Sequence, residues 1–191
     1  VADTAGGGAP GDGTTILAEL IDQSARKAVI VLCDGAAVRA AKALGVGAVF
    51  SGNVGGKSDD LHGPPMPLVG EIIFQEAVRY QRRGDYMTGQ WIDLGEVAVI
   101  QADGVSVMLT EAKAMPFDAD HLAAAGIAAE MQQIIVVKSA IAWQAHFQTF
   151  AKGEIYVDTP GVCASNLKRF EYTKLDRAIY PIDDDGIWPA K

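Results

Sequence analysis

The apolar run in KAVIVLC, at positions 27–33, constrains the fold of this chain more than any other feature. A strand that is apolar at successive positions is buried on both faces, which is typical of parallel sheets covered by helices. A predicted amphipathic helix at 14–24 precedes the run, and an alanine-rich helix at 36–45 follows it. With a short strand at 46–52, this order predicts an α/β fold whose N-terminal part is a parallel sheet.

The middle of the chain has a different pattern. Segments 66–81 and 91–110 are rich in β-branched residues, which favour strands. Asp103 and Gly104 lie between two apolar runs, and this dipeptide is a strong signal for a tight hairpin turn. The middle part is therefore predicted to be an antiparallel β-hairpin sheet.

The last third of the chain gives weaker signals. They predict a buried strand at 132–140, a helix at 140–151, a strand at 154–161 and an extended surface tail at 176–191. No internal repeat or low-complexity linker divides the chain. We therefore expect one α/β domain over residues 1–191, built on a single mixed sheet.

The net charge and the apolar runs of the sequence limit which partners and locations are expected. The net charge of −8 argues against nucleic acid and anionic membranes as partners. No apolar run approaches the roughly 18 residues that a membrane span needs, and no signal peptide is visible. A cytoplasmic location is expected, with Cys33 and Cys163 reduced.

A glycine-rich loop, GGGAPGDGT at 6–14, comes directly before the first predicted helix. Gly6, Gly7 and Gly8 give the backbone freedom to approach another group closely. Such a loop can direct free N–H groups at an anion, such as a carboxylate, a phosphate or an oxyanion. Asp12 is a good N-cap for the helix. The pattern is neither the dinucleotide fingerprint nor the Walker loop, and a tight turn packed under a neighbouring domain is the simpler alternative.

Other candidate site residues are two lysines and a histidine. Lys57 and His62 lie with Asp59 and Asp60 in GGKSDDLHG, which is either a functional loop or a solvated turn. Lys138 ends the strand predicted at 132–140, and it is a candidate for binding a substrate carboxylate. Its alternative role is an ion pair with a structural aspartate.

The sequence offers no certain catalytic residue and no metal site. The three histidines, His62, His121 and His146, are scattered along the chain, and none has the spacing of a zinc motif. His121 follows Asp118 and Asp120, either of which would cap a short helix. His146 is expected to be a partly buried histidine on a helix.

Four motifs in order along the chain resemble the C-terminal domain of the microcystinase C family of metallopeptidases. The motifs are GGGAPGDGT (6–14), GGKSDDLHGPP (55–65), YMTGQ (86–90) and VVKSA (136–140), and the similarity continues to RAIYPID (177–183). Each motif is weak alone, but their order and spacing are specific. The family's loop reads DNPGGGAPGDGT, so Thr4 and Ala5 replace its asparagine and proline.

The resemblance implies a larger, two-domain metallopeptidase of which this chain is the C-terminal domain. The zinc ligands, histidines and carboxylates, would lie in the N-terminal domain, and the substrate would be a small or linear peptide. The glycine loop would face the domain interface, with Lys57, His62 and Lys138 lining the same cleft. The chain alone would be inactive.

Two other functions stay open at this point. The chain could be a stand-alone α/β module that binds a small anion without catalysis. It could also use a nucleotide, with Asp34, about 20 residues after the loop, binding the ribose. Association into a homo-oligomer also stays open.

Overall fold

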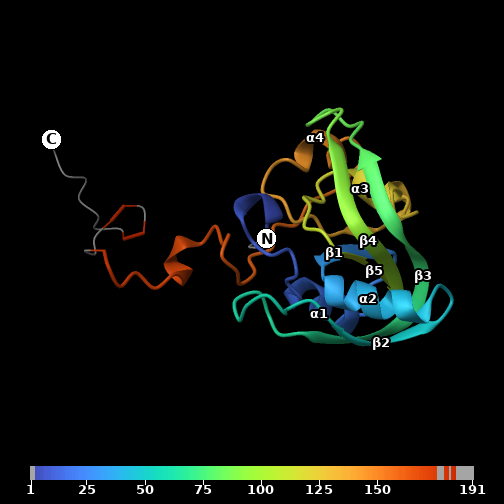
Figure 1. The fold of residues 1–191 in the computed structure, drawn as a ribbon. Coiled ribbons are helices and arrows are strands. Elements are labelled where there is room, and N and C mark those ends of the chain that lie inside the picture. Colours follow the sequence, from blue (N-terminus) through green and yellow to red (C-terminus); the bar gives the residue numbers. More distant parts are fainter. Residues whose placement is uncertain (1–2, 176–178, 181, 184–191) are drawn as a thin grey trace.

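The computed structural model describes residues 3–175, 179, 180, 182 and 183. Most of the tail predicted at 176–191 lies outside these residues. In Figure 1 a rounded body holds the sheet and most helices, among them α4 (Gln144–Phe147), and the last described part of the chain extends away from this body. Within the described part of the chain, no helix has the length and apolarity needed to cross a membrane.

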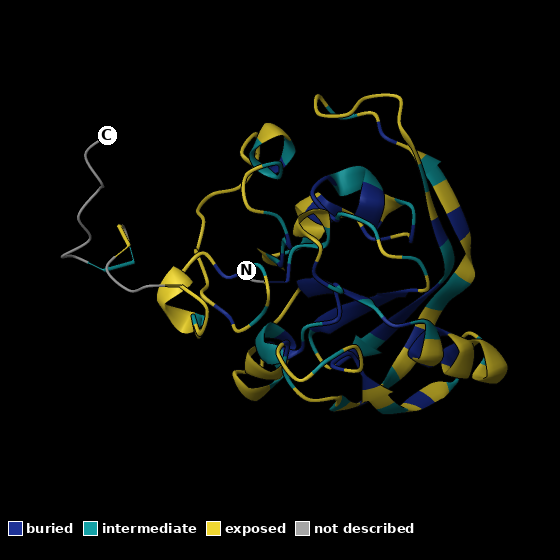
Figure 2. Ribbon diagram, turned by 60° about the vertical axis from the view of Figure 1, so that its left-hand side comes forward, coloured by how far each residue is buried: buried dark blue, intermediate teal, exposed yellow. Residues whose placement is uncertain are grey.

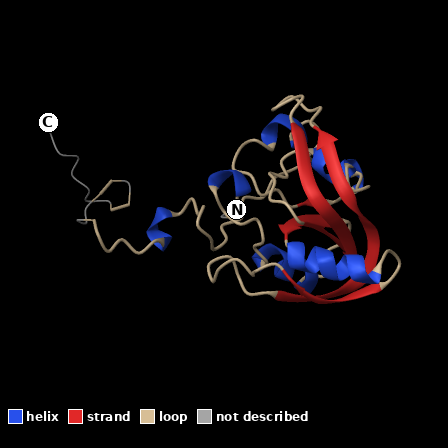
Figure 3. Cartoon of the chain, viewed as in Figure 1, coloured by secondary structure: helices blue, strands red, loops and turns tan. Residues whose placement is uncertain are grey.

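A mixed sheet of six strands, in the order β2-β3-β4-β5-β1-β6, forms the centre of the body (Figure 3). The strands are β1 (Ala28–Cys33), β2 (Val49–Val54), β3 (Met66–Gln81), β4 (Trp91–Ala102), β5 (Val105–Thr110) and β6 (Ile134–Ile135). β1 pairs in parallel with β5 and β6, and the other pairs are antiparallel. The predicted α/β fold with a single mixed sheet is confirmed.

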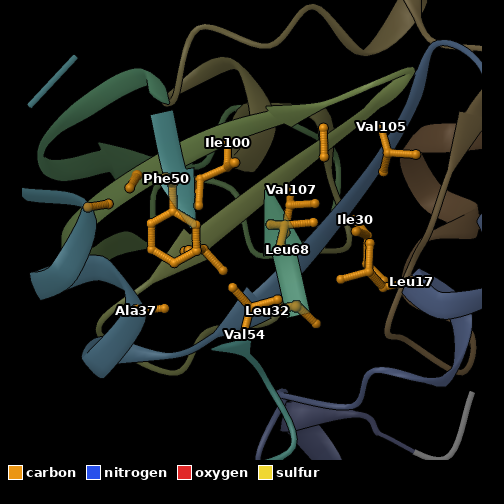
Figure 4. Packing of buried hydrophobic residues seen from close by; sticks show 14 of the residues in the cluster. Leu17, Ile30, Leu32, Ala37, Phe50, Val54, Leu68, Ile100, Val105 and Val107 are labelled. Carbon is orange, nitrogen blue, oxygen red and sulfur yellow. The ribbon is translucent and has the colours of Figure 1, made fainter. Parts of the chain in front are cut away.

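The sheet carries an apolar cluster on each face, and β1 contributes to both. Ile30 and Leu32 pack with helices α1 (Thr15–Asp22) and α2 (Gly35–Leu44), as Figure 4 shows for Leu17 and Ala37. Val29 and Val31 belong to the opposite cluster, which includes side chains from α3 (Ala119–Ala123) and α4. Figure 2 shows this buried centre in dark blue. The apolar run at 27–33 is thus buried on both faces, as its sequence predicts.

The hairpin between β4 and β5 also follows its prediction. Ala102 pairs with Val105 across a two-residue turn, and Asp103 has a φ of 51°. This left-handed conformation is the one that a tight hairpin turn requires. The hairpin joins β5 to β4. The other edge of β5 pairs in parallel with β1, so β5 connects the antiparallel and parallel parts of the sheet.

Several predicted elements are shorter or paired differently. The strand predicted at 46–52 is β2, and it pairs antiparallel with β3 rather than joining the parallel part. The strand predicted at 132–140 is only β6, and the helix predicted at 140–151 is only α4. The segment at 154–161 forms no strand. Three 3-10 helices complete the described elements: η1 (Ala5–Gly7), η2 (Ala129–Met131) and η3 (Leu167–Arg169).

Candidate functional site

The glycine loop holds an anion, and that anion is a carboxylate of the same chain. The backbone N–H groups of Gly11 and Gly13 donate to Asp3 Oδ1 and Oδ2, both at 2.7 Å. Lys138 Nζ donates to Asp3 Oδ2 at 2.6 Å. Asp3 is 3% exposed and Lys138 is 4% exposed. The loop therefore has the anion-holding geometry that its glycines suggest, with Asp3 in the position of the anion.

Lys138 links the loop to the end of the sheet. After β6 the chain turns toward the loop, and Lys138 Nζ also donates to the carbonyl oxygen of Gly11 at 2.8 Å. Burial lowers the pKa of Lys138, and the neighbouring Asp3 carboxylate opposes this shift. The pairing with an aspartate is the structural alternative that the sequence left open. Binding of a substrate carboxylate by Lys138 stays a prediction.

The first three glycines of the loop are exposed and form a turn around η1. Gly7 N–H donates to Thr4 O at 2.9 Å, and Gly8, with a φ of 101°, donates to Ala5 O at 3.1 Å. A Cβ on Gly7 would lie 2.6 Å from Cys163 Sγ, and a Cβ on Gly6 would collide with Met115. A larger residue at either position would therefore displace the side chain of Met115 or Cys163.

Asp12 joins the loop to the segment at 53–65. Its Oδ2 accepts hydrogen bonds from the backbone N–H groups of Lys57 at 2.9 Å and Ser58 at 3.0 Å. The prediction that Asp12 caps the first helix is wrong, because Thr14 is the N-cap of α1. The physical reason is that the carboxylate satisfies the N–H groups of a distant turn instead. Asp12 Oδ1 has no hydrogen-bond partner among the described residues.

Asp34 and Lys57 form a second connection at the same end of the sheet. Lys57 Nζ lies 2.7 Å from Asp34 Oδ2 and 2.8 Å from the carbonyl oxygen of Asn53. Asp34 Oδ1 caps α2 by accepting the N–H of Ala37, and Oδ2 also accepts the N–H of Gly55. Both carboxylate oxygens are engaged and the residue is buried, which argues against Asp34 as a ribose ligand.

His62 is fully buried and lies between two carboxylates. Its Nδ1 is 2.7 Å from Asp59 Oδ1, and its Nε2 is 4.0 Å from Asp3 Oδ1. The backbone N–H of Val162 donates to Nε2 at 3.3 Å, so Nδ1 carries the proton that Asp59 accepts. The hydrogen bond from His62 lowers the pKa of Asp59. The alternative of a solvated turn is therefore wrong for His62, while Asp60 is exposed.

These connections meet at the carboxyl end of the parallel strands. Cys33 N–H, at the end of β1, donates to Gly11 O at 3.0 Å. Two small pockets lie beside Lys138, one lined by Asp3 and Thr159 and the other by Cys33. Ligands of open α/β sheets gather at this edge. The structure thus brings the glycine loop, His62 and Lys138 together, with Lys57 beside Asp12 at its border.

Neither cysteine is disulfide-bonded in the structure. Burial raises the pKa of the Cys33 thiol, which disfavours the nucleophilic thiolate. Among the residues that the structure describes, no group of three or more histidine, cysteine or acidic side chains could hold a metal ion.

A second buried polar cluster lies where β3 meets α3. Asp118 caps α3 by accepting His121 N–H at 3.0 Å, as predicted, and it forms an ion pair with Arg82. The Tyr80 hydroxyl is 3.1 Å from His121 Nδ1. Burial lowers the pKa of His121 to about 3 and raises the pKa of Tyr80 to about 12. His146 is half-buried and contacts Phe147 and Phe150 edge-on.

Sequence reasoning missed the central residue of the loop. Asp3 is separated from the glycines that it contacts by residues 4–10, so no short pattern links it to them. The signal that could have found it is the family's loop motif, which begins with aspartate. The sequence shows Asp59 only as a neighbour of His62. The spacing of three residues between Asp59 and His62 suits the local hydrogen bond that the structure contains.

Comparisons with known proteins agree on one family. The model described as the MlrC C-terminus matches residues 1–174. Microcystinase C from Sphingomonas sp. is 27% identical over 183 residues, which are 95% of this chain and 34% of that protein. The crystal structure of a candidate metallopeptidase from Mesorhizobium sp. BNC1 matches with a TM-score of 0.85 and 29% identity, over 95% of this chain and 36% of that one. The chain thus spans about a third of the length of these relatives.

Proposed function

Because this chain belongs to the MlrC C-terminus family, we propose that it acts as the C-terminal domain of a metal-dependent peptide or amide hydrolase. The names of its relatives, a microcystinase and a candidate metallopeptidase, support a role in peptide hydrolysis. The substrate in this proposal is a small or linear peptide. The remaining part of the longer protein, an N-terminal domain, would hold the metal, expected to be zinc.

The observation that carries the proposal is the loop around Asp3 at the carboxyl edge of the parallel strands. Asp3, Gly11, Gly13 and Lys138 form a buried, hydrogen-bonded unit. In this proposal Lys138 is a positioning residue because it holds Asp3, and His62 is one because it is buried and joins Asp59, Thr14 and Val162. The exposed turn at Gly6–Gly8 and the half-buried Lys57 are the groups that a bound peptide could reach.

The described side chains do not fit a metal site, because their histidines and carboxylates form no cluster of ligands. No step of the proposal therefore runs through a metal held by this chain. A metal in the other domain would polarise the scissile carbonyl and activate water. The role of this chain would be to align the peptide, and misalignment alone can cost about 100-fold in rate.

The test compares the full-length gene product with the chain of residues 1–191. We expect the full-length product to contain stoichiometric metal and to hydrolyse linear peptides, with activity lost on chelation. The isolated chain should contain no bound metal and show no hydrolysis. Metal analysis and a peptide cleavage assay measure both properties. Peptide hydrolysis by residues 1–191 alone that resists chelators would overturn the proposal.

The stand-alone binding alternatives have less support. Nucleotide binding would need free N–H groups in the loop, but Gly11 and Gly13 donate to Asp3. A small external anion would have to displace that carboxylate. Titration of the isolated chain with phosphate or acetate tests this alternative, and tight binding would favour it over the hydrolase.

A further inference from the structure

The segment at 154–158, EIYVD, exposes three large side chains in succession. Ile155 is 90% exposed, Tyr156 is 70% exposed and Val157 is 43% exposed. β-Branched and aromatic residues favour strands, but in the described part of the chain this segment has no sheet neighbour. A cluster of exposed apolar side chains marks a surface that meets another protein surface.

The exposed segment is fixed in place at its C-terminal side. Thr159 and Ala164 are buried, and the Val162 N–H donates to His62 Nε2 at 3.3 Å. Cys163 Sγ is 3.7 Å from the carbonyl oxygen of Thr4. The exposed segment therefore leads directly into residues 159–164, which contact His62 and the glycine loop.

The first described residues contact the segment at 159–164. The contact between Thr4 and Cys163 joins the segment preceding the glycine loop to residues 159–164. Under the proposed function, the N-terminal domain is attached ahead of Asp3. A covalent link of this kind gives the domain a high effective concentration at the exposed segment.

We propose that residues 154–158 are the docking surface on which the N-terminal, metal-bearing domain of the longer protein lies. This inference rests on the proposed function, and it names the surface through which the two domains meet. The relatives contain about two thirds of their length beyond the part matched here, which is ample to cover it. The partner surface is apolar, because Ile155, Tyr156 and Val157 are the exposed centre and Asp158 is already paired with Arg169 at 2.9 Å.

Amide hydrogen exchange followed by mass spectrometry tests the docking surface. We expect peptides covering residues 153–158 to exchange at least about tenfold more slowly in the full-length gene product than in residues 1–191. The difference should be the same at low and high protein concentration. Exchange in residues 1–191 could instead become slower as the protein concentration rises. That result would identify a second copy as the occupant and would overturn the proposal.

A matched pair of variants sharpens the test. Replacing Ile155 and Tyr156 by serine in the full-length product should restore fast exchange at 153–158. Replacing Val49 and Val69 by serine is the control, because both valines are 64% exposed but lie on β2 and β3. This control should leave exchange at 153–158 slow. If the Ile155 and Tyr156 variant does not fold, the two unsubstituted proteins still decide the question.

The docking surface and the proposed function can fail separately. Equally fast exchange at 153–158 in both proteins overturns the docking surface, even when the full-length product binds metal and cleaves peptides. Slow exchange in a full-length product that neither binds metal nor cleaves peptides overturns the metal-dependent hydrolase and leaves the domain contact supported.

Discussion

Individual residues at the glycine loop depend on one buried ion pair. Asp3 receives two backbone hydrogen bonds and the Lys138 ammonium in a site that excludes water. Removing one partner of a buried pair leaves an uncompensated charge, which is far more damaging than losing an exposed pair. The loop therefore depends on Lys138 even though this residue lies 135 positions away from Asp3.

The substitution Lys138→Met should lower the free energy of unfolding by roughly 3–5 kcal/mol. Arg39→Met is the control, because the side chains of Arg39 and its partner Glu111 are 66% and 42% exposed and this pair should contribute about 1 kcal/mol or less. Urea denaturation of the isolated chain measures both. Equal and small losses in the two variants would contradict a buried pair at the loop.

His121 should make stability dependent on pH. Its pKa is about 3 in the folded chain, against 6.5 for an unperturbed histidine, so the unfolded chain binds the proton more strongly. The contribution of neutral His121 to the free energy of unfolding is complete above pH 6.5. It is lost as the pH falls toward 3, by on the order of 1.4 kcal/mol per pH unit.

His121→Asn removes the titrating group and keeps an acceptor for the Tyr80 hydroxyl. Denaturation between pH 7 and pH 4.5 should therefore show a shallower loss of stability in the variant than in the parent chain. Identical pH profiles would mean that His121 does not account for the dependence.

At this scale the sequence could identify candidates but not their partners. Lys57 and His62 stand out because they cluster with two aspartates in a glycine-rich loop, and Lys138 stands out because it follows an apolar run. The partner of Lys138 could not be read, because the pair joins opposite ends of the chain. The same holds for His62, whose Nε2 meets a residue 100 positions later.

The elements of the fold differ in how well their sequences specify them. β1 and the β4–β5 hairpin agree with prediction, because apolar runs and the Asp103–Gly104 turn are local signals. The pairing of β2 with β3 could not be predicted, because periodicity reports a strand and not its neighbour. The segment at 154–161 has strand-forming residues without a described sheet neighbour, so its local preference was misleading.

The N-cap residue of helix α2 has three roles. Asp34 caps the helix, accepts the Gly55 N–H and pairs with Lys57. Asp34→Ala should therefore lower the free energy of unfolding by about 2–4 kcal/mol, because a cap and a buried acceptor are lost together. Asp60→Ala, at an exposed position, is the control. Thermal denaturation that shifts equally in both variants would contradict this role for Asp34.

At the scale of the whole molecule, the central strands β1, β4 and β5 each contribute side chains to both apolar clusters. Ile30 and Leu32 of β1 belong to one cluster, and Val29 and Val31 belong to the other. Loss of either cluster therefore exposes the same strand, which favours a single cooperative unit. Far-ultraviolet circular dichroism and tryptophan fluorescence should give coincident urea transitions. Two separate transitions would show that the clusters unfold independently.

The long separation between Asp3 and Lys138 also sets the order of events during translation. The ribosome adds about 5–20 residues per second, so on the order of ten seconds pass between synthesis of the two residues. Throughout this interval the glycine loop of the nascent chain lacks its cation, although α1 and β1 are synthesised near its start. The loop is thus assembled late in synthesis, and a chaperone that binds nascent chains has access to it first.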